Sequence, residues 1–129
     1  MSRSEEEARN LAIATEMYNT VIVPFDSAHL DRFFPSDYIQ HSNLADDGRE
    51  GLKTFLDEAK TRFPNAKIEI RRAFADGPYV IFHVWGRLEE GGPASAIVDI
   101  FRLEGGLIRE HWEVIQEIPG AVQHGNGPF

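Results

Sequence analysis

The sequence predicts an α+β fold: a cone-shaped α+β barrel in which three N-terminal helices pack on a curved antiparallel sheet. Apolar residues recur every three or four positions up to Phe63, and every two positions from Asn65 onward. Both faces of the later strands carry apolar or aromatic residues. Helices must therefore cover one face of the sheet, and the other face must curl around something. A length of 129 residues fits one core, so residues 1–129 are taken as a single domain.

The helices are placed by their start and stop signals. Ser4 and Glu7 form a capping box, and the helix that they open should end near Val21–Pro24, where β-branched residues and proline interrupt it. A short second helix is expected at about Ser27 to Phe34. The third, at about Glu50 to Phe63, carries apolar residues at helical spacing along one face.

The strands follow from alternation and from turn residues. A brief extended segment is expected at Asp37–His41. Four longer strands are expected at Lys67–Phe74, Tyr79–Leu88, Ser95–Leu103 and Leu107–Gln116. The tail, Pro119–Phe129, is rich in glycine and proline and is expected to be irregular.

Composition argues against several classes of partner. The net charge is −8, with 21 acidic and 13 basic residues, so the surface repels phosphate backbones and anionic lipids. The sequence therefore indicates neither a nucleic-acid partner nor a membrane partner. It contains no cysteine, which excludes disulfides and thiolate metal sites. The N-terminal residues lack the apolar core of a signal peptide, so a cytoplasmic location is expected.

The last hairpin is expected to bring polar residues together. A three-residue loop that pairs Leu103 with Leu107 suits its turn, with Gly106 in the left-handed conformation. Asp99 then lies opposite His111. On this register one face carries Ile97, Asp99, Phe101, His111 and Glu113.

A two-residue loop is the alternative. It places Asp99 opposite Trp112 and breaks the grouping. In the preceding strand, His83 and Trp85 have the same odd parity, so both are expected to extend the polar face. Trp112 is then assigned to the core or to a subunit interface.

Three segments carry a resemblance to a known family. The hairpin Val98–Gln116, with its Glu-His-Trp-Glu sequence, resembles the closing hairpin of SnoaL-like polyketide cyclases, in the nuclear transport factor two-like superfamily. Tyr38–His41 and the ending Gly125–Phe129 resemble one branch of the family. The resemblance implies an α+β cone, an intramolecular aldol ring closure without metal or organic cofactor, and a homodimer formed through the back of the sheet. It also implies an acid/base role for Glu113, where the family usually has aspartate.

Aldol chemistry requires a base beside a carbonyl and donors for the enolate oxygen. Glu113 in a partly apolar pocket is the candidate base, since burial raises the pKa of a carboxyl. His111, His83 and His41 are candidate donors, and Asp99 would orient His111. Alternatively, Asp99 and His111 form a purely structural pair. Contacts with the substrate are expected from His41, His83, Trp85, Phe101, Tyr38 and Phe129, the last of these as a plug over the pocket mouth.

Three functions remain open from the sequence. The first is cyclase- or isomerase-type proton transfer, including aldol closure, on a small, largely apolar carbonyl compound. The second is a non-catalytic domain that binds a small hydrophobic ligand, and the third is a hydrolase or isomerase that uses the same pocket. Histidine and carboxylate are potential metal ligands, but their spacing matches no recognised metal motif, so no metal and no cofactor is expected.

Overall fold

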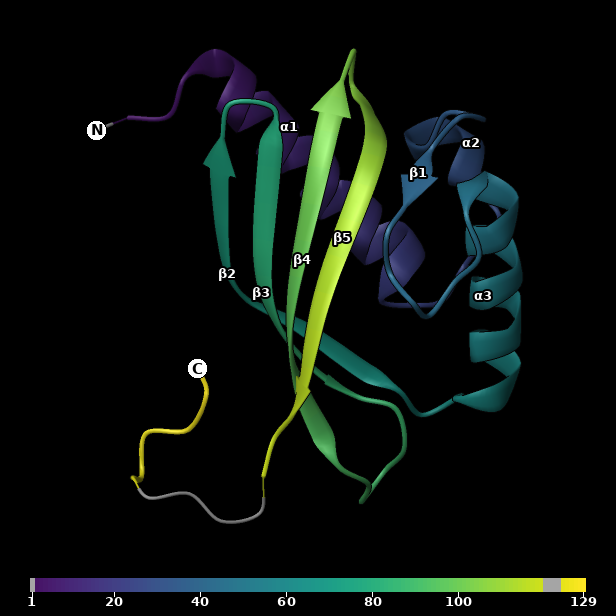
Figure 1. Ribbon diagram of the computed structural model, residues 1–129, viewed down its shortest axis with the longest axis vertical. Coiled ribbons are helices and arrows are strands. Elements are labelled where there is room, and N and C mark those ends of the chain that lie inside the picture. The colour runs from purple at the N-terminus through teal and green to yellow at the C-terminus, as the bar shows by residue number, and fades with distance from the viewer. Residues whose placement is uncertain (1, 120–123) are drawn as a thin grey trace.

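The computed structural model of the protein describes residues 2–119 and 124–129. Its first half contains α1 (Glu5–Met17), the π-helical turn η1 (Tyr18–Ile22), α2 (Leu30–Phe33), β1 (Ile39–Gln40) and α3 (Gly48–Arg62). Its second half contains β2 (Lys67–Asp76), β3 (Tyr79–Arg87), β4 (Ala94–Glu104) and β5 (Leu107–Glu117). Figure 1 shows α1 crossing behind the long, curved strands and α3 standing beside β1 at one edge. The α+β fold expected from the sequence is confirmed, although the sheet does not close into a barrel.

The helices begin where side chains cap them. The Ser4 hydroxyl accepts a hydrogen bond from the Glu7 backbone N–H, and the Glu7 carboxylate accepts one from the Ser4 N–H, which confirms the capping box. The third helix starts earlier than expected because Asp47 caps it. The second is shorter, since the Asp26 carboxylate accepts from the Ala28 N–H and holds that segment as a turn.

The sheet is mixed rather than antiparallel, which corrects the sequence prediction. Its strand order is β1-β5-β4-β3-β2 among the described residues. The short strand β1 lies parallel to β5, with Ile39 beside Glu110 and Gln40 beside His111. This pairing places the loop that follows β1 next to the middle of β5.

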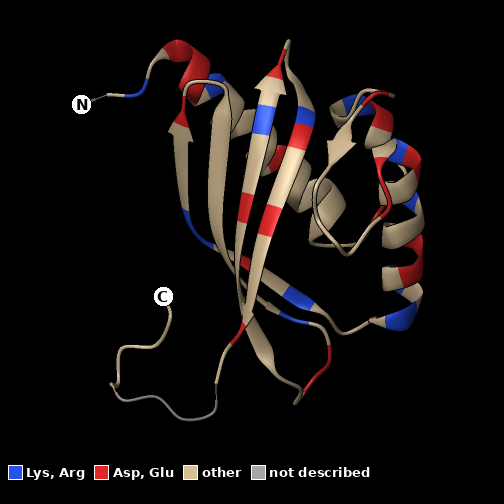
Figure 2. Ribbon diagram, viewed as in Figure 1, with Lys and Arg blue, Asp and Glu red and all other residues tan. Residues whose placement is uncertain are grey.

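The register of the last hairpin differs from the expected one. Gly105 and Gly106 both have positive φ angles, 61° and 79°, and form a two-residue turn. A bulge at Arg109 then adds one residue to β5, so Asp99 pairs with Glu113 rather than with His111. The total shift is two residues, and the expected grouping on one face survives. Figure 2 shows acidic positions side by side in the middle of β4 and β5.

The parity expected for β3 is wrong. Its register with β4 places His83 beside Val98 and Trp85 beside Ala96, so odd residues of β3 pair with even residues of β4. His83 and Trp85 therefore lie on the outer face, away from α1. Asp99 instead pairs with Phe82, which is fully buried.

The core lies between the inner face of the sheet and the helices. Helix α1 and the turn η1 contribute residues at helical spacing, and β3 contributes every second residue. The fully buried members include Ala14, Met17, Val21, Leu56, Val80, Phe82, Val84 and Ile108. No helix within residues 2–119 and 124–129 has both the length and the apolar character needed to span a bilayer.

Candidate functional site

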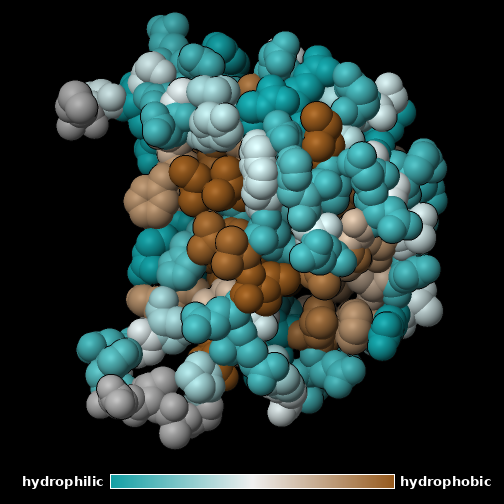
Figure 3. Space-filling view, in the orientation of Figure 1, coloured by the Kyte–Doolittle hydropathy of each residue, from teal (hydrophilic) through white to brown (hydrophobic). Residues whose placement is uncertain are grey.

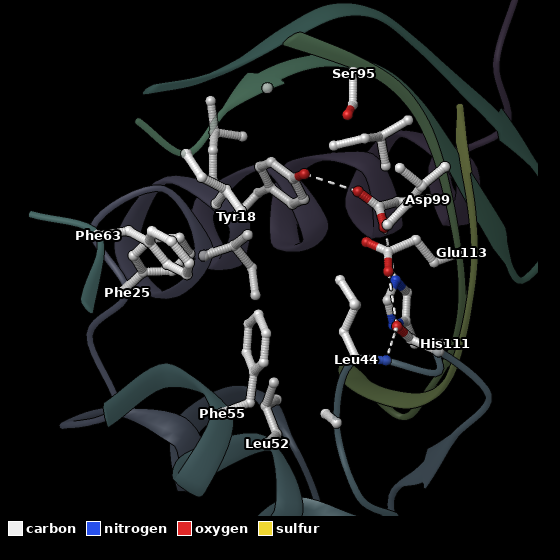
Figure 4. Close-up of a pocket in the computed structure, with 18 of the residues that line it drawn as sticks. Tyr18, Phe25, Leu44, Leu52, Phe55, Phe63, Ser95, Asp99, His111 and Glu113 are labelled. Carbon is white, nitrogen blue, oxygen red and sulfur yellow. Dashed lines mark hydrogen bonds and ion pairs between the residues drawn. The ribbon is translucent and has the colours of Figure 1, made fainter. Parts of the chain in front are cut away.

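A cavity of about 450 Å³ opens between the inner face of the sheet, the turn η1 and helix α3. Most of its lining is apolar. Figure 4 shows aromatic rings and Leu52 on one side of the cavity, opposite a group of polar side chains on β4 and β5. The apolar lining residues include Ile22, Phe25, Phe34, Leu44, Leu52, Phe55, Phe63, Ile68, Ile97, Phe101 and Ile115.

The aromatic wall depends on an unusual backbone conformation. Phe25 has a φ of 51°, which is left-handed and costly for a bulky residue. Its ring is nonetheless buried and meets Phe55 edge to face, with a centroid distance of 6.3 Å. The strain is therefore offset by packing that completes the cavity wall.

The polar side of the cavity is organised around Asp99, a carboxylate that is only 2% exposed. The Tyr18 hydroxyl donates a hydrogen bond to Asp99 Oδ2 at 2.7 Å. The Nε2 atom of His111 lies 2.8 Å from the other oxygen, Oδ1. Both oxygens of this buried carboxylate therefore have partners, as burial requires. Tyr18 comes from the π-helical turn, a feature often found at functional sites.

Glu113 lies beside this pair and faces the cavity (Figure 4). The Ser42 hydroxyl donates to Glu113 Oε1 at 2.7 Å, from the loop that follows β1. Burial, followed by the negative charge of Asp99, raises the pKa of Glu113 from 4.5 to about 7. A carboxyl with this pKa exchanges protons near neutral pH, as a general acid or base must.

The strand β1 and its flanks complete the polar group. Gln40 Oε1 lies 2.8 Å from His111 Nδ1, and Gln40 Nε2 donates to the Tyr38 hydroxyl at 2.8 Å. Tyr38 is buried and lines the cavity, and Phe101 stacks on the His111 ring at 4.7 Å. Five of the residues named from the sequence, including Asp99 and Glu113, thus share one site.

His41 lies outside the cavity, which corrects its expected placement. Its ring stacks on Trp112 at 5.0 Å, and its Nε2 atom lies 2.6 Å from Glu110 Oε2. In an extended segment alternate side chains point to opposite faces, so Gln40 and Ser42 face the cavity and His41 faces outward. Trp112 also lies on the outer face.

The other three expected substrate contacts also lie on the outer side. His83 Nδ1 lies 2.6 Å from the Arg72 guanidinium, and its ring packs on Phe129. The Trp85 ring contacts the guanidinium groups of Arg71 and Arg87, at 5.9 Å and 5.5 Å from its centroid. Phe129 therefore rests against the back of the sheet and does not plug the cavity. Residues 120–123 of the tail lie outside the described part of the chain.

Three site residues were missed in the sequence. Gln40 and Ser42 lie on either side of His41 and two positions apart, so in an extended segment their side chains share one face. Knowing the direction of one side chain would therefore have identified both. Tyr18 continues the helical spacing of Leu11 and Ala14, which indicates only the apolar face of a helix. No local signal indicates that its hydroxyl meets Asp99, because the contact joins residues 81 positions apart.

The site also contains the atoms that a metal ion would need. Ligand atoms of Asp99, His111 and Glu113 lie within 4.8 Å of one another. However, both nitrogens of His111 and both oxygens of Asp99 already have hydrogen-bond partners. A metal would have to displace these contacts, so the donor set fits a proton-sharing network better than a metal site.

Comparison with known proteins gives a family and a fold. The family model described as a SnoaL-like domain matches residues 14–111. No match was found among curated proteins.

Several solved structures are similar to this chain at low identity. A protein named as a polyketide cyclase from Bacillus cereus is 19% identical, with a TM-score of 0.74 over 88% of this chain and 78% of that one. A protein named as a ketosteroid isomerase from Kribbella flavida is 18% identical, with a TM-score of 0.68 over 95% and 86%. An NTF2-like protein from Mesorhizobium loti is 14% identical, with a TM-score of 0.73 over 89% and 97%. At these identities the likeness establishes the fold.

Proposed function

Because the chain belongs to the family of SnoaL-like domains, we propose that its cavity carries out acid/base chemistry on a small, largely apolar carbonyl compound. The observation that carries this proposal is Glu113, whose pKa of about 7 belongs to a carboxyl facing an apolar cavity. The names of two structural neighbours, polyketide cyclase and ketosteroid isomerase, support it. Both names denote chemistry that begins with removal of a proton next to a carbonyl.

In the proposed reaction Glu113 removes that proton. Its Oε1 atom accepts from Ser42, and the proton from the substrate carbon is assigned to Oε2. The electron pair of the broken C–H bond moves onto the carbonyl oxygen and forms an enolate. The enolate then either regains a proton at another carbon or attacks a second carbonyl of the same molecule. In the second case Glu113 returns its proton to the new alkoxide.

The enolate oxygen needs a hydrogen-bond donor, and the Tyr38 hydroxyl fits this role. It accepts from Gln40, so its own proton is available to a ligand in the cavity. His111 is less suitable, because Gln40 and Asp99 already occupy its two nitrogens. Asp99 and His111 therefore act on Glu113 rather than on the substrate.

The lining favours an uncharged substrate. Its ionisable residues are mainly acidic, with Glu89 and Glu117 at the mouth in addition to Asp99 and Glu113 inside. A substrate carboxylate or phosphate would meet repulsion from each of these groups. Ketones with an apolar body are therefore the compounds to test first.

The direct test is exchange of α-protons for deuterium. A panel of small apolar ketones is incubated with the protein in D₂O, and loss of the α-proton signal is followed by NMR. Glu113→Gln keeps the shape of the side chain and should slow exchange by about 100-fold or more. Glu58→Gln, an exposed change on α3, is the matched control and should leave the rate unchanged. Equal exchange by wild type and Glu113→Gln would exclude Glu113 as the base.

The apolar walls also favour a second candidate, a domain that binds a hydrophobic ligand without turnover. Calorimetry separates the two functions. If wild type and Glu113→Gln bind a ketone with the same affinity and wild type does not exchange its α-protons, the result supports the binding domain. Binding by both proteins with exchange by wild type alone supports the enzyme.

We also propose that two copies pair through the outer face of the sheet. Figure 3 shows apolar side chains gathered over β3, β4 and β5 on the face turned away from α1. Phe74 is 52% exposed there and Val114 is 63% exposed. Light scattering should give twice the 14.6 kDa mass of one chain. Val114→Lys places a charge in the apolar patch and should reduce the measured mass to that of a single chain. A wild-type mass of one chain would contradict the pairing.

A further inference from the structure

Gln40 is the polar side chain of β1, and the proton transfer proposed above uses only its contact with Tyr38. Its carbonyl oxygen accepts from the Ser42 backbone N–H at 3.0 Å and lies 2.8 Å from His111 Nδ1. Its amide nitrogen donates to the Tyr38 hydroxyl. The Gln40 backbone is also fixed, since its N–H donates to Asp47 Oδ1 at 2.8 Å.

One of these contacts decides the orientation of the amide. The oxygen and nitrogen of a glutamine side chain are nearly interchangeable in shape, and only the hydrogen-bond partners distinguish them. A backbone N–H can only donate. The atom that meets the Ser42 N–H must therefore be the Gln40 oxygen, which can only accept.

This orientation determines where His111 carries a proton. Since the Gln40 oxygen only accepts, the facing Nδ1 of His111 must be protonated. The other nitrogen, Nε2, faces Asp99 Oδ1 at 2.8 Å, and one proton must lie between them. Without that proton, a lone pair of His111 would face a buried carboxylate. The alternative tautomer, with the proton on Nε2 and none on Nδ1, sets a lone pair of Nδ1 against the lone pairs of the Gln40 oxygen at 2.8 Å.

The proton shared by His111 and Asp99 affects the ionisation of Glu113, because it changes the charge beside that carboxyl. When His111 and Asp99 hold the additional proton, the positive charge of His111 opposes the negative charge of Asp99, which itself raises the pKa of Glu113. When they lack it, the pair is negative and opposes ionisation of Glu113. The titratable groups that face this cluster are Asp99 on β4, Glu113 on β5, Tyr18 on η1, Tyr38 before β1 and Asp47 at the start of α3.

We propose that Gln40 is a positioning residue that holds a proton on Nδ1 of His111, so that the His111–Asp99 pair stays neutral and Glu113 ionises as the base. The inference rests on the proposed function for its consequence in catalysis. The position of the proton on His111 rests on the hydrogen bonds alone. Gln40 touches His111 and does not itself need to touch the substrate.

The first measurement is made on the wild-type protein. Long-range ¹H–¹⁵N correlation spectra of labelled protein distinguish a protonated from an unprotonated imidazole nitrogen. His111 Nδ1 should be of the protonated type at every pH at which the protein is folded. An unprotonated Nδ1 at neutral pH would overturn the proposal without any variant.

Two variants then distinguish the effect of the Gln40 acceptor oxygen from the effect of the size of the side chain. Gln40→Met removes the acceptor, so His111 should lose the preference for a proton on Nδ1. Gln40→Glu keeps an acceptor oxygen and should restore the protonated Nδ1. Gln116→Met, on the exposed end of β5, is the matched control and should change neither.

The pH profile of deuterium exchange gives the catalytic consequence. Gln40→Met should move the acid limb of this profile to higher pH by about one unit or more, since Glu113 then ionises beside a negative pair. An unmoved limb together with an unchanged His111 spectrum would overturn the positioning role. If His111 behaves as expected but wild type exchanges no ketone, the proposed function fails while the proton assignment stands.

Discussion

The raised pKa of Glu113 predicts a stability effect that needs no knowledge of the substrate. Between pH 4.5 and about 7 the unfolded chain loses the proton of Glu113, whereas the folded chain retains it. The folded state is therefore favoured at low pH, and this advantage is lost as the pH rises through 7. Above that pH the native protein bears a carboxylate that is disfavoured by burial and by Asp99.

The size of the effect follows from the two pKa values. A rise from 4.5 to about 7 corresponds to about 3 kcal/mol, at roughly 1.4 kcal/mol for each pH unit. This figure is an upper bound, because Glu113 is only partly buried and water screens its charge. Glu113→Gln removes the charge and retains an oxygen that accepts from Ser42, so the variant escapes the penalty.

The assay is urea unfolding of wild type and Glu113→Gln from pH 4.5 to pH 8. The two free energies of unfolding should be similar at pH 4.5, and the variant should be more stable at pH 8 by up to about 3 kcal/mol. Thermal unfolding should show a rise in midpoint of up to about 10 °C at the higher pH. Glu58→Gln, which removes an exposed charge, should follow the wild-type curve. Parallel curves for wild type and Glu113→Gln would refute the argument, since Glu113 would then ionise without cost in the folded protein.

Two further predictions concern the contacts of the site and the position of the tail. Tyr18→Phe deletes the hydroxyl that donates to buried Asp99 and should lower the free energy of unfolding by about 1–3 kcal/mol in urea titrations; an unchanged value would mean that another group satisfies Asp99. Deletion of 125–129 removes the contact of Phe129 with His83 on the outer face, so ketone affinity measured by calorimetry should change less than about two-fold. A large loss of affinity would instead place the tail over the cavity.

The sequence predicts the helices and strands of this fold better than it predicts the register between neighbouring strands. Alternation identifies Val80, Phe82 and Val84 as one face of a strand, and all three are buried. It does not state which face of the next strand they join. That depends on whether the register pairs odd with odd or odd with even residues, which the loop between β3 and β4 leaves open. His83 and Trp85 were placed in the cavity for this reason.

The register of the β4–β5 hairpin was also not predictable from the sequence, but here the expected grouping of residues on one face is present. Two positive-φ glycines favour a two-residue turn, which alone would have separated Asp99 from Glu113. The bulge at Arg109 restores the grouping, and nothing in the local sequence announces it. The contact of Gln40 with His111 was equally hidden, because it requires a parallel pairing between segments 71 residues apart.

The bulge at Arg109 also bears on how this hairpin tolerates changes in length. Arg109 is the extra residue of β5 and has no partner on β4, so deleting it would remove the bulge and leave Asp99 paired with Glu113. If Arg109 instead entered the ladder, every later side chain of β5 would turn to the opposite face. Trp112 and Val114 would then enter the cavity, and His111 and Glu113 would lie on the outer surface. The hairpin should therefore tolerate the loss of this residue better than its incorporation into the strand, and the chemistry of the cavity depends on keeping Arg109 out of the ladder.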